Sequence, residues 1–104
     1  MLKKRTFALA IALSLPLLAN AAGDPAAGKA KSGICAGCHG ANGIAIAPMY
    51  PNLKGQQAMY LETALKGFRD QSRKGGQSAL MYGMAAPLTD ADIKNLAAYY
   101  SSLK

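Results

Sequence analysis

Two cysteines and a histidine lie within five residues of one another, as Cys35-Ala36-Gly37-Cys38-His39. Two thiols separated by two residues, with an imidazole directly after the second, form the pattern at which haem is attached covalently to a polypeptide. Each thiol would add to one vinyl group of the porphyrin, and the histidine would supply one axial ligand to the iron. Because the motif occurs once, it predicts one covalently bound haem per chain.

Three other kinds of site can use such a pair of cysteines. A Cys35–Cys38 disulfide would close a very short loop and stabilise little, because the entropic effect grows with loop length. A thioredoxin-like redox centre needs a βαβ setting, and no strand-like alternation is visible in the sequence. A structural zinc site needs four ligands, whereas the chain has only these two cysteines and His39. The sequence therefore favours the haem over these alternatives.

The start of the chain has the three parts of a secretory signal peptide. Basic residues at 3–5 precede an apolar run over 7–18, and small residues at 19 and 21 match a cleavage site. The apolar run is shorter than the ~20 residues that span a bilayer, and no cysteine follows it for lipid attachment. We expect residues 1–21 to be a cleaved leader and residues 22–104 to form one domain in the periplasm, without stable insertion in the membrane.

Helix signals divide the rest of the chain into helical regions and loops. Asp24-Pro25 is typical of a helix start, and this helix should end near Gly33. A second helix is predicted from Gln56 to Arg73, and a third begins at the N-cap Thr89. The segments between them, which include the Cys35–His39 motif, 40–55 and 77–87, are predicted to be loops. The sequence thus predicts an all-α domain of three to five helices joined by long loops.

Two of these helices have an apolar face at the spacing i, i+3, i+4, i+7. Lys66, Arg69 and Asp70 lie off the face of the second helix and are expected in solvent. Gly28 lies inside the first helix, where glycine costs about 1 kcal/mol relative to alanine. Either another helix approaches closely there, or the glycine is merely tolerated. The two faces consist of Leu61, Ala64, Leu65 and Phe68, and of Ile93, Leu96, Ala97 and Tyr100.

Four segments together carry a resemblance to a known family. They are CAGCHG at 35–40, YPNLKGQ at 50–56, FRDQSR at 68–73 and MAAPLTDADIKNLAAYY at 84–100. On these segments the chain resembles class I c-type cytochromes over essentially all of residues 22–104. It is most similar to domains of bacterial periplasmic cytochromes, some of which carry two such domains in tandem. The resemblance implies a cytochrome c fold, with helices and long loops wrapped around one haem c.

The resemblance also implies roles for individual residues. Cys35 and Cys38 would form the thioethers, and His39 would be the proximal iron ligand. Pro51 would accept a hydrogen bond from the imidazole through its backbone carbonyl, which fixes the tautomer of the ligand. Leu53 and Tyr60 would pack on the haem, Arg73 would lie near a haem propionate, and Gly28 would meet Tyr99 or Tyr100 where the first and last helices cross.

The second axial ligand is implied to be a methionine, since there is no second histidine. Met49 lies in the loop on the histidine side, and Met59 is expected to fill a gap in the core at the start of a helix. Met81 and Met84 remain, both in the segment before the last helix, where the family has its ligand. The spacing of relatives places this ligand about seven residues before Leu88, which favours Met81 over Met84.

A histidine and a methionine on the iron would leave no open position for a substrate. The implied function is a periplasmic electron carrier that cycles between Fe(II) and Fe(III) and is not an enzyme. Its redox partners would be a quinol-oxidising complex and a terminal oxidase or reductase of a respiratory chain. The alternative is a haem-based sensor of small ligands or a weak peroxidase, which would need a labile methionine ligand.

Charge bears on the kind of partner. The chain has a formal net charge of +7, and loss of the leader would leave nine basic and five acidic residues. This excess is compatible with partners that have acidic surfaces, and equally with basic residues that only keep the protein soluble. No basic cluster is interleaved with aromatic residues, so the sequence gives no support for binding of nucleic acid.

Overall fold

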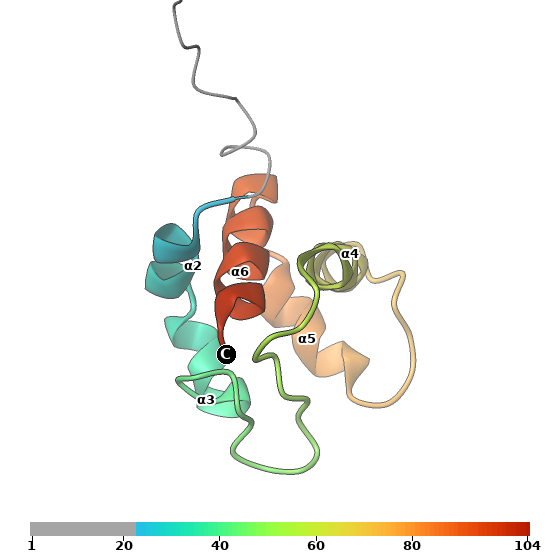
Figure 1. The fold of residues 1–104 in the computed structure, drawn as a ribbon. Helices are drawn as coiled ribbons and strands as arrows, with labels where there is room; N and C mark the ends of the chain where they lie inside the picture. The colour runs from blue at the N-terminus through green and yellow to red at the C-terminus, as the bar shows by residue number, and fades with distance from the viewer. Residues whose placement is uncertain (1–22) are drawn as a thin grey trace, which may run out of the picture.

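The structure of the chain, a computed structural model, describes residues 23–104, which form five α-helices and no strand (Figure 1). The predicted leader, 1–21, lies outside the described residues. The prediction of an all-α fold with three to five helices is confirmed. The helices are α2 (Pro25–Lys31), α3 (Gly33–His39), α4 (Ala58–Arg69), α5 (Ser78–Ala85) and α6 (Asp90–Ser102).

The most extensive helix contact joins the two ends of the domain, α2 and α6. Helix α2 begins where predicted, and the Asp24 side chain accepts a hydrogen bond from the Ala26 N–H at 2.9 Å. The Asp24 N–H in turn donates to Oδ1 of Asn95 at 2.8 Å. A Cβ at Gly28 would press against the Asn95 carbonyl and lie 2.8 Å from the Cβ of Tyr99. The close approach predicted from Gly28 is therefore present, and Tyr99 is the aromatic residue at the crossing.

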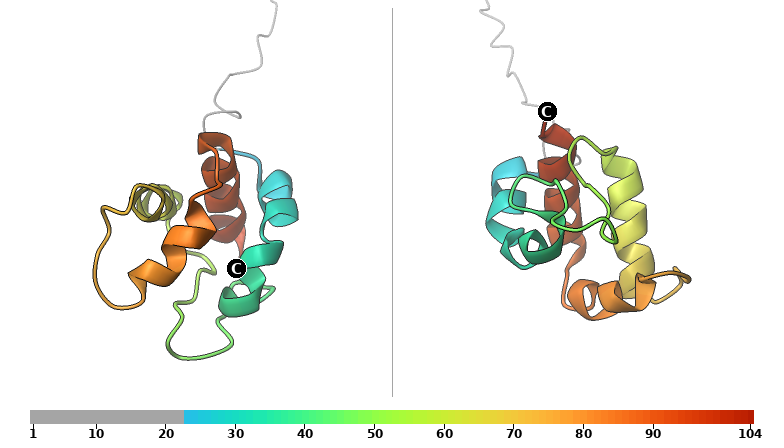
Figure 2. Two further views of the ribbon diagram at one scale, coloured as in Figure 1. Left: turned by 180° about the vertical axis from the view of Figure 1, so that it is seen from behind. Right: turned by 90° about the horizontal axis from the view of Figure 1, so that it is seen from below.

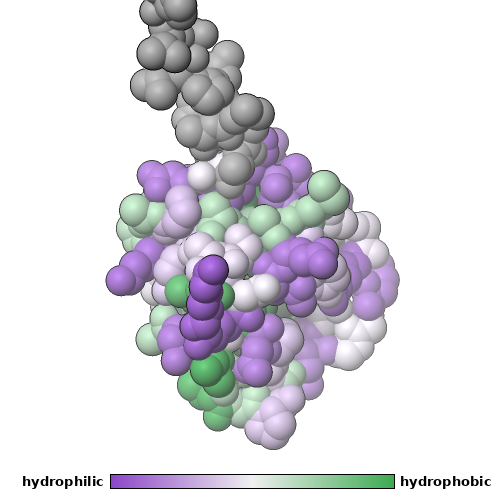
Figure 3. Space-filling view, viewed as in Figure 1, coloured by the Kyte–Doolittle hydropathy of each residue, from purple (hydrophilic) through white to green (hydrophobic). Residues whose placement is uncertain are grey.

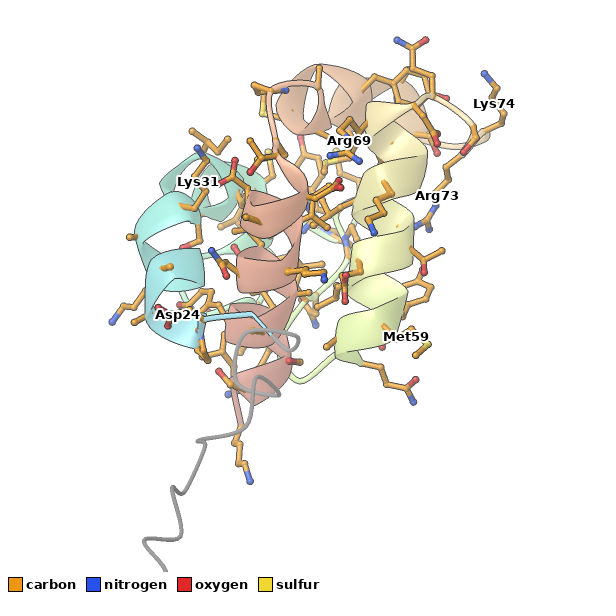
Figure 4. The ribbon with its side chains drawn as sticks, turned by 90° about the horizontal axis from the view of Figure 1, so that it is seen from above. Asp24, Lys31, Met59, Arg69, Arg73 and Lys74 are labelled. Atoms are coloured by element: carbon orange, nitrogen blue, oxygen red, sulfur yellow. The ribbon has the colours of Figure 1, made fainter. Side chains whose placement is uncertain are left out.

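Helix α6 carries most of the core. It begins with a capping box, in which Thr89 Oγ1 accepts from the Asp92 N–H and the Asp92 carboxylate accepts from the Thr89 N–H, each at 3.0 Å. Lys31 on α2 forms an ion pair with Asp92 at 3.6 Å (Figure 4). The apolar face predicted for this helix is confirmed, since all four of its members are buried: Ile93, Leu96, Ala97 and Tyr100.

Helix α4 is shorter than predicted at both ends. Its C-terminal end is set by the turn that follows, where Asp70 Oδ1 accepts from the Ser72 N–H at 2.9 Å and Gln71 adopts a positive φ of 61°. The Arg73 N–H then bonds back to the Gly67 carbonyl at 3.1 Å. These local hydrogen bonds compete with continuation of the helix, so α4 ends at Arg69 and residues 70–71 form a turn.

Arg69 is not simply solvated, so that expectation is wrong. Its guanidinium forms an ion pair with Asp90 at 2.7 Å and donates to the Leu88 carbonyl at 3.1 Å. These contacts fasten the end of α4 to the start of α6. The sequence could not show them, because the two segments are brought together only by the tertiary fold.

Two helices replace predicted loops. Helix α5 occupies most of 77–87, and its sequence, SALMYGMA, is apolar on nearly every side, so it has no amphipathic period to detect. Helix α3 contains the whole cysteine motif and has two glycines among seven residues, which lowers its intrinsic propensity. Cys35 packs against the core of α6, so tertiary packing stabilises a helix that local preference does not predict.

A long connection runs from α3 to α4 along the lower edge of the domain in Figure 1. Seen from below, this loop crosses between α3 and α4 (Figure 2). Met59, at the start of α4, extends away from the other helices and is 79% exposed (Figure 4), so the expectation that it fills a core gap is wrong. Among residues 23–104, no helix has the length and apolar character needed to cross a membrane.

The crossing of α2 and α6 gives a first prediction. Gly28→Ala should lower the free energy of unfolding by about 1–3 kcal/mol, because the added methyl group meets backbone atoms that have no room to move. Gly83→Ala is the matched control, since Gly83 also lies inside a helix but has open space around it. The control should raise stability by up to about 1 kcal/mol. Denaturant unfolding of both variants measures this, and equal effects would contradict the close approach.

Candidate functional site

A cavity of about 700 Å³ lies between the helices of the domain and opens to the surface. Four helices, α3 to α6, contribute to its walls, together with the loops that join them. The apolar face predicted for α4 points into it, which explains why that face is only partly buried in protein. A mostly apolar cavity of this size is typical of a cofactor site. The α4 residues in its wall are Tyr60, Leu61, Ala64, Leu65 and Phe68.

His39 stands at the wall of this cavity, at the end of α3, and is only 7% exposed. Its Nδ1 lies 2.8 Å from the carbonyl oxygen of Pro51. A carbonyl can only accept, so the proton of the imidazole is on Nδ1 and the lone pair is on Nε2. The contact therefore fixes the tautomer that leaves Nε2 available to a metal ion.

The two cysteines of the motif also line the cavity. Cys35 is half-buried, Cys38 is exposed, and no disulfide joins them. Burial raises the pKa of the Cys35 thiol, and the neighbouring Tyr100 hydroxyl offsets part of this effect. Both sulfur atoms are thus accessible from the cavity.

The loop that carries Pro51 is held by polar contacts. The Ala45 N–H donates to Oδ1 of Asn52 at 2.7 Å, and the N–H groups of Leu53 and Lys54 donate to the Gly43 carbonyl at 2.8 and 3.0 Å. Asn52 follows directly after the proline that contacts the histidine. Sequence analysis missed its role, because an asparagine in a loop is usual whether or not it joins distant residues.

Apolar burial is uneven along this loop, since Leu53 packs against the core. Ile44 and Ile46 are 47% and 69% exposed. Strongly hydrophobic residues gather at the lower end of the face in Figure 3, over the loop between α3 and α4. The position of the Pro51 carbonyl therefore depends on the hydrogen bonds within the loop together with the packing of Leu53.

Three further residues expected at the site line the same cavity, namely Leu53, Tyr60 and Arg73. Arg73 donates a hydrogen bond to the Tyr60 hydroxyl at 3.2 Å. Its guanidinium also lies 4.8 Å from the ring centroid of Phe68, a distance at which cation and ring attract each other. Figure 4 shows Arg73 beside α4, at the end away from Met59.

Both candidate methionines reach the cavity. Met81 and Met84 lie three residues apart on α5, and both are part of the cavity wall. Met81 is partly buried, whereas Met84 is 49% exposed. Met49 lines the cavity from the loop after α3, while Met59 takes no part in it. The cavity thus brings together an imidazole nitrogen, two thiols and thioether sulfur.

Comparison with known proteins identifies the family. The chain matches the family model described as cytochrome c over residues 20–104. It is 58% identical over 81 residues to cytochrome c-554(548) of Halomonas halodenitrificans, covering 78% of this chain and 98% of that protein. It is 40% identical over 103 residues to cytochrome c4 of Pseudomonas aeruginosa, covering 99% of this chain and 50% of that protein. The chain belongs to the cytochrome c family.

A solved structure agrees with this assignment. Reduced recombinant cytochrome c4 from Pseudomonas stutzeri matches with a TM-score of 0.70 and 39% identity, over 80% of this chain and 47% of that one. The chain therefore spans about half the length of the cytochrome c4 proteins that it matches. The fold prediction of a class I cytochrome c is confirmed by this likeness and by the family model.

The cytochrome c family binds covalently attached haem c, and Cys35 and Cys38 fit the attachment motif. The cavity suits this group, since its walls are largely apolar and a buried imidazole and two thiols line it. Haem c supplies an iron that accepts and releases one electron. The predictions of haem c and of a single-haem electron carrier, which exchanges electrons with redox partners, are confirmed by the relatives.

The loop after α3 gives a second prediction. Asn52→Ala should lower the free energy of unfolding of the haem-loaded protein by about 0.5–1.5 kcal/mol, since one hydrogen bond across the loop is lost. Asn42→Ala is the control, because Asn42 Oδ1 accepts only from the nearby Ile44 N–H, at 3.2 Å. Denaturant unfolding should show a smaller effect for the control. A larger effect of Asn42→Ala would contradict the role of Asn52.

Proposed function

We propose that the protein is a periplasmic electron carrier and not an enzyme. It would take electrons from a quinol-oxidising complex and pass them to a terminal oxidase or reductase. The observation that carries the proposal is the fixed tautomer of His39, whose Nε2 is left free at the wall of a large apolar cavity. Such a side chain can hold an iron without reorganising.

The proposed ligand set is His39 with Met81, and thioethers at Cys35 and Cys38. Met81 is favoured over Met84 because a ligand sulfur must be inside the cavity, and Met84 is half-exposed to solvent. A strong ligand on each side leaves no position for a substrate, and methionine favours the ferrous state relative to a second histidine. Both properties suit transfer of electrons without transformation of a bound molecule.

The remaining site residues are assigned supporting roles. We assign to the Pro51 carbonyl the orientation of the ligand imidazole, which their 2.8 Å contact supports. Leu53 and Tyr60 would pack on the haem. Arg73 would offer its guanidinium to a haem propionate, and its place in the cavity wall supports this.

The distribution of charged residues along the chain supports redox partners with acidic surfaces. No acidic residue occurs between Pro25 and Leu61, the part of the chain that carries the cysteine motif and the loop after it. The same part contains Lys29, Lys31 and Lys54. Basic residues around a site speed the encounter with an acidic partner more than they increase the affinity of the complex.

The ligand assignment is tested by visible absorption of the oxidised protein. Methionine ligation produces a weak band at long wavelength, and this band should be lost in Met81→Ala and retained in Met84→Ala. Carbon monoxide should bind the reduced Met81→Ala protein and not the wild type, because only the variant has an open position. If the band is lost only in Met84→Ala, Met84 and not Met81 is the ligand, and the proposal of an electron carrier is unaffected. Carbon monoxide binding by the wild type would favour a ligand sensor.

We further propose that residues 1–21 direct export and are removed. The mass of the haem-loaded protein from the periplasmic fraction should correspond to a chain that begins at Ala22. As a control, Ala19→Lys and Ala21→Lys together should block cleavage, because the cleavage site requires small residues. A mature wild-type protein that retains residues 1–21 would contradict the proposal.

A further inference from the structure

The hydroxyl of Tyr100 is a buried donor without an acceptor. Tyr100 lies on α6 among the residues that line the haem cavity, and it is only 3% exposed. Its Oη forms no hydrogen bond with any residue in 23–104, and it is the one such buried side-chain atom in this part of the chain. Buried polar groups nearly always have a partner, and an unpaired one costs about 1–3 kcal/mol.

The adjacent tyrosine does not share this property. The rings of Tyr99 and Tyr100 lie 4.9 Å apart between centroids, and the Tyr99 hydroxyl donates to the Ala41 carbonyl at 3.3 Å. The backbone of Tyr100 is also engaged, since its carbonyl accepts from the Gly55 N–H at 2.9 Å. The unpaired hydroxyl is therefore on a side chain whose position is well fixed.

Cys35 and Ser32 are the neighbours that offer an acceptor. Burial raises the pKa of the Tyr100 hydroxyl and the neighbouring Cys35 raises it further, while Ser32 partly offsets this, so the group keeps its proton and remains a donor. Ser32 Oγ already donates to the Lys29 carbonyl at 2.7 Å. Cys35 is a free cysteine and shares the wall of the cavity with Tyr100.

Attachment of haem c changes what this sulfur can do. A thiol is both a weak donor and a weak acceptor, whereas a thioether sulfur is only an acceptor. Once Cys35 has become a thioether, the hydroxyl of Tyr100 faces a sulfur atom that can no longer compete as a donor. Attachment would therefore leave beside the buried hydroxyl a sulfur that can only accept.

We propose that Tyr100 is a positioning residue that donates a hydrogen bond to the thioether sulfur of Cys35. The bond orients this edge of the haem against α6 and withdraws electron density from it, which favours the ferrous state. Hydrogen bonds around a haem are one means by which a protein sets its reduction potential. The inference rests on the proposed attachment of haem through Cys35.

The first test compares the reduction potentials of the haem-loaded Tyr100→Phe and Tyr99→Phe proteins. Tyr100→Phe should lower the potential, by an amount equivalent to an about twofold to tenfold change in the equilibrium constant for reduction, the range that loss of one hydrogen bond can produce. Tyr99→Phe removes a hydroxyl from the same part of α6 and should have a clearly smaller effect. Equal shifts in the two variants would overturn the proposal.

The second test identifies the acceptor with double-mutant cycles. The effect of Tyr100→Phe on the potential should persist in Ser32→Ala and disappear in Cys35→Ala. The reverse pattern would make Ser32 the acceptor and overturn the proposal. If Cys35→Ala does not retain haem, proton NMR of the reduced wild-type protein replaces it. A cross-relaxation signal between the Tyr100 hydroxyl proton and the Cys35 β protons is then expected, and its absence overturns the proposal.

Different results would contradict the proposed attachment of haem through Cys35 and the proposed hydrogen bond from Tyr100. Mass spectrometry of the haem peptide from the wild-type protein shows whether a thioether is present at Cys35. A missing thioether would contradict the proposed attachment, and with it the inference about Tyr100. An intact thioether with no specific effect of Tyr100→Phe would overturn the inference alone.

Discussion

The central cavity is the constraint on which the rest of the structure depends. A domain of about eighty residues has little core, and here most of its helices turn an apolar face toward a space that protein atoms do not fill. Only α2 has no residue in the cavity wall, and it packs on α6 instead. The packing between helices and the packing on the haem are therefore parts of one core, which Leu96, Ala97 and Tyr100 connect.

The ends of the domain and the chemistry of its site could be predicted from the sequence. Asp24 and Thr89 form the helix caps that their residue types indicate. The histidine beside the second cysteine lies at the cavity wall with its Nδ1 on the Pro51 carbonyl. These features can be predicted from the sequence because each depends on a short motif or on one helical period. Gly28 is similar, since a glycine inside a helix indicates a close neighbour without naming it.

The parts that the sequence did not predict depend on tertiary contacts. Helix α5 has no polar side to give a period, and α3 forms although two glycines weaken it. The hydrogen bond from the Ala45 N–H to Asn52 Oδ1 joins segments whose approach follows only from the fold. The contacts of Arg69 with Leu88 and Asp90 do the same. The choice between Met81 and Met84 is of the same kind, because α5 presents both sulfur atoms to one cavity.

The contact between the first and last helices has a consequence for folding kinetics. The hydrogen bond from Asp24 to Asn95 joins residues 71 positions apart. Contacts of such long range give a high contact order and are slow to form, because the entropy of closing the chain is lost before they stabilise anything. The packing around Gly28 can be completed only after the whole of α6 has been synthesised. Until then the cysteine motif, which directly follows α2, belongs to an open chain that an attachment enzyme can reach.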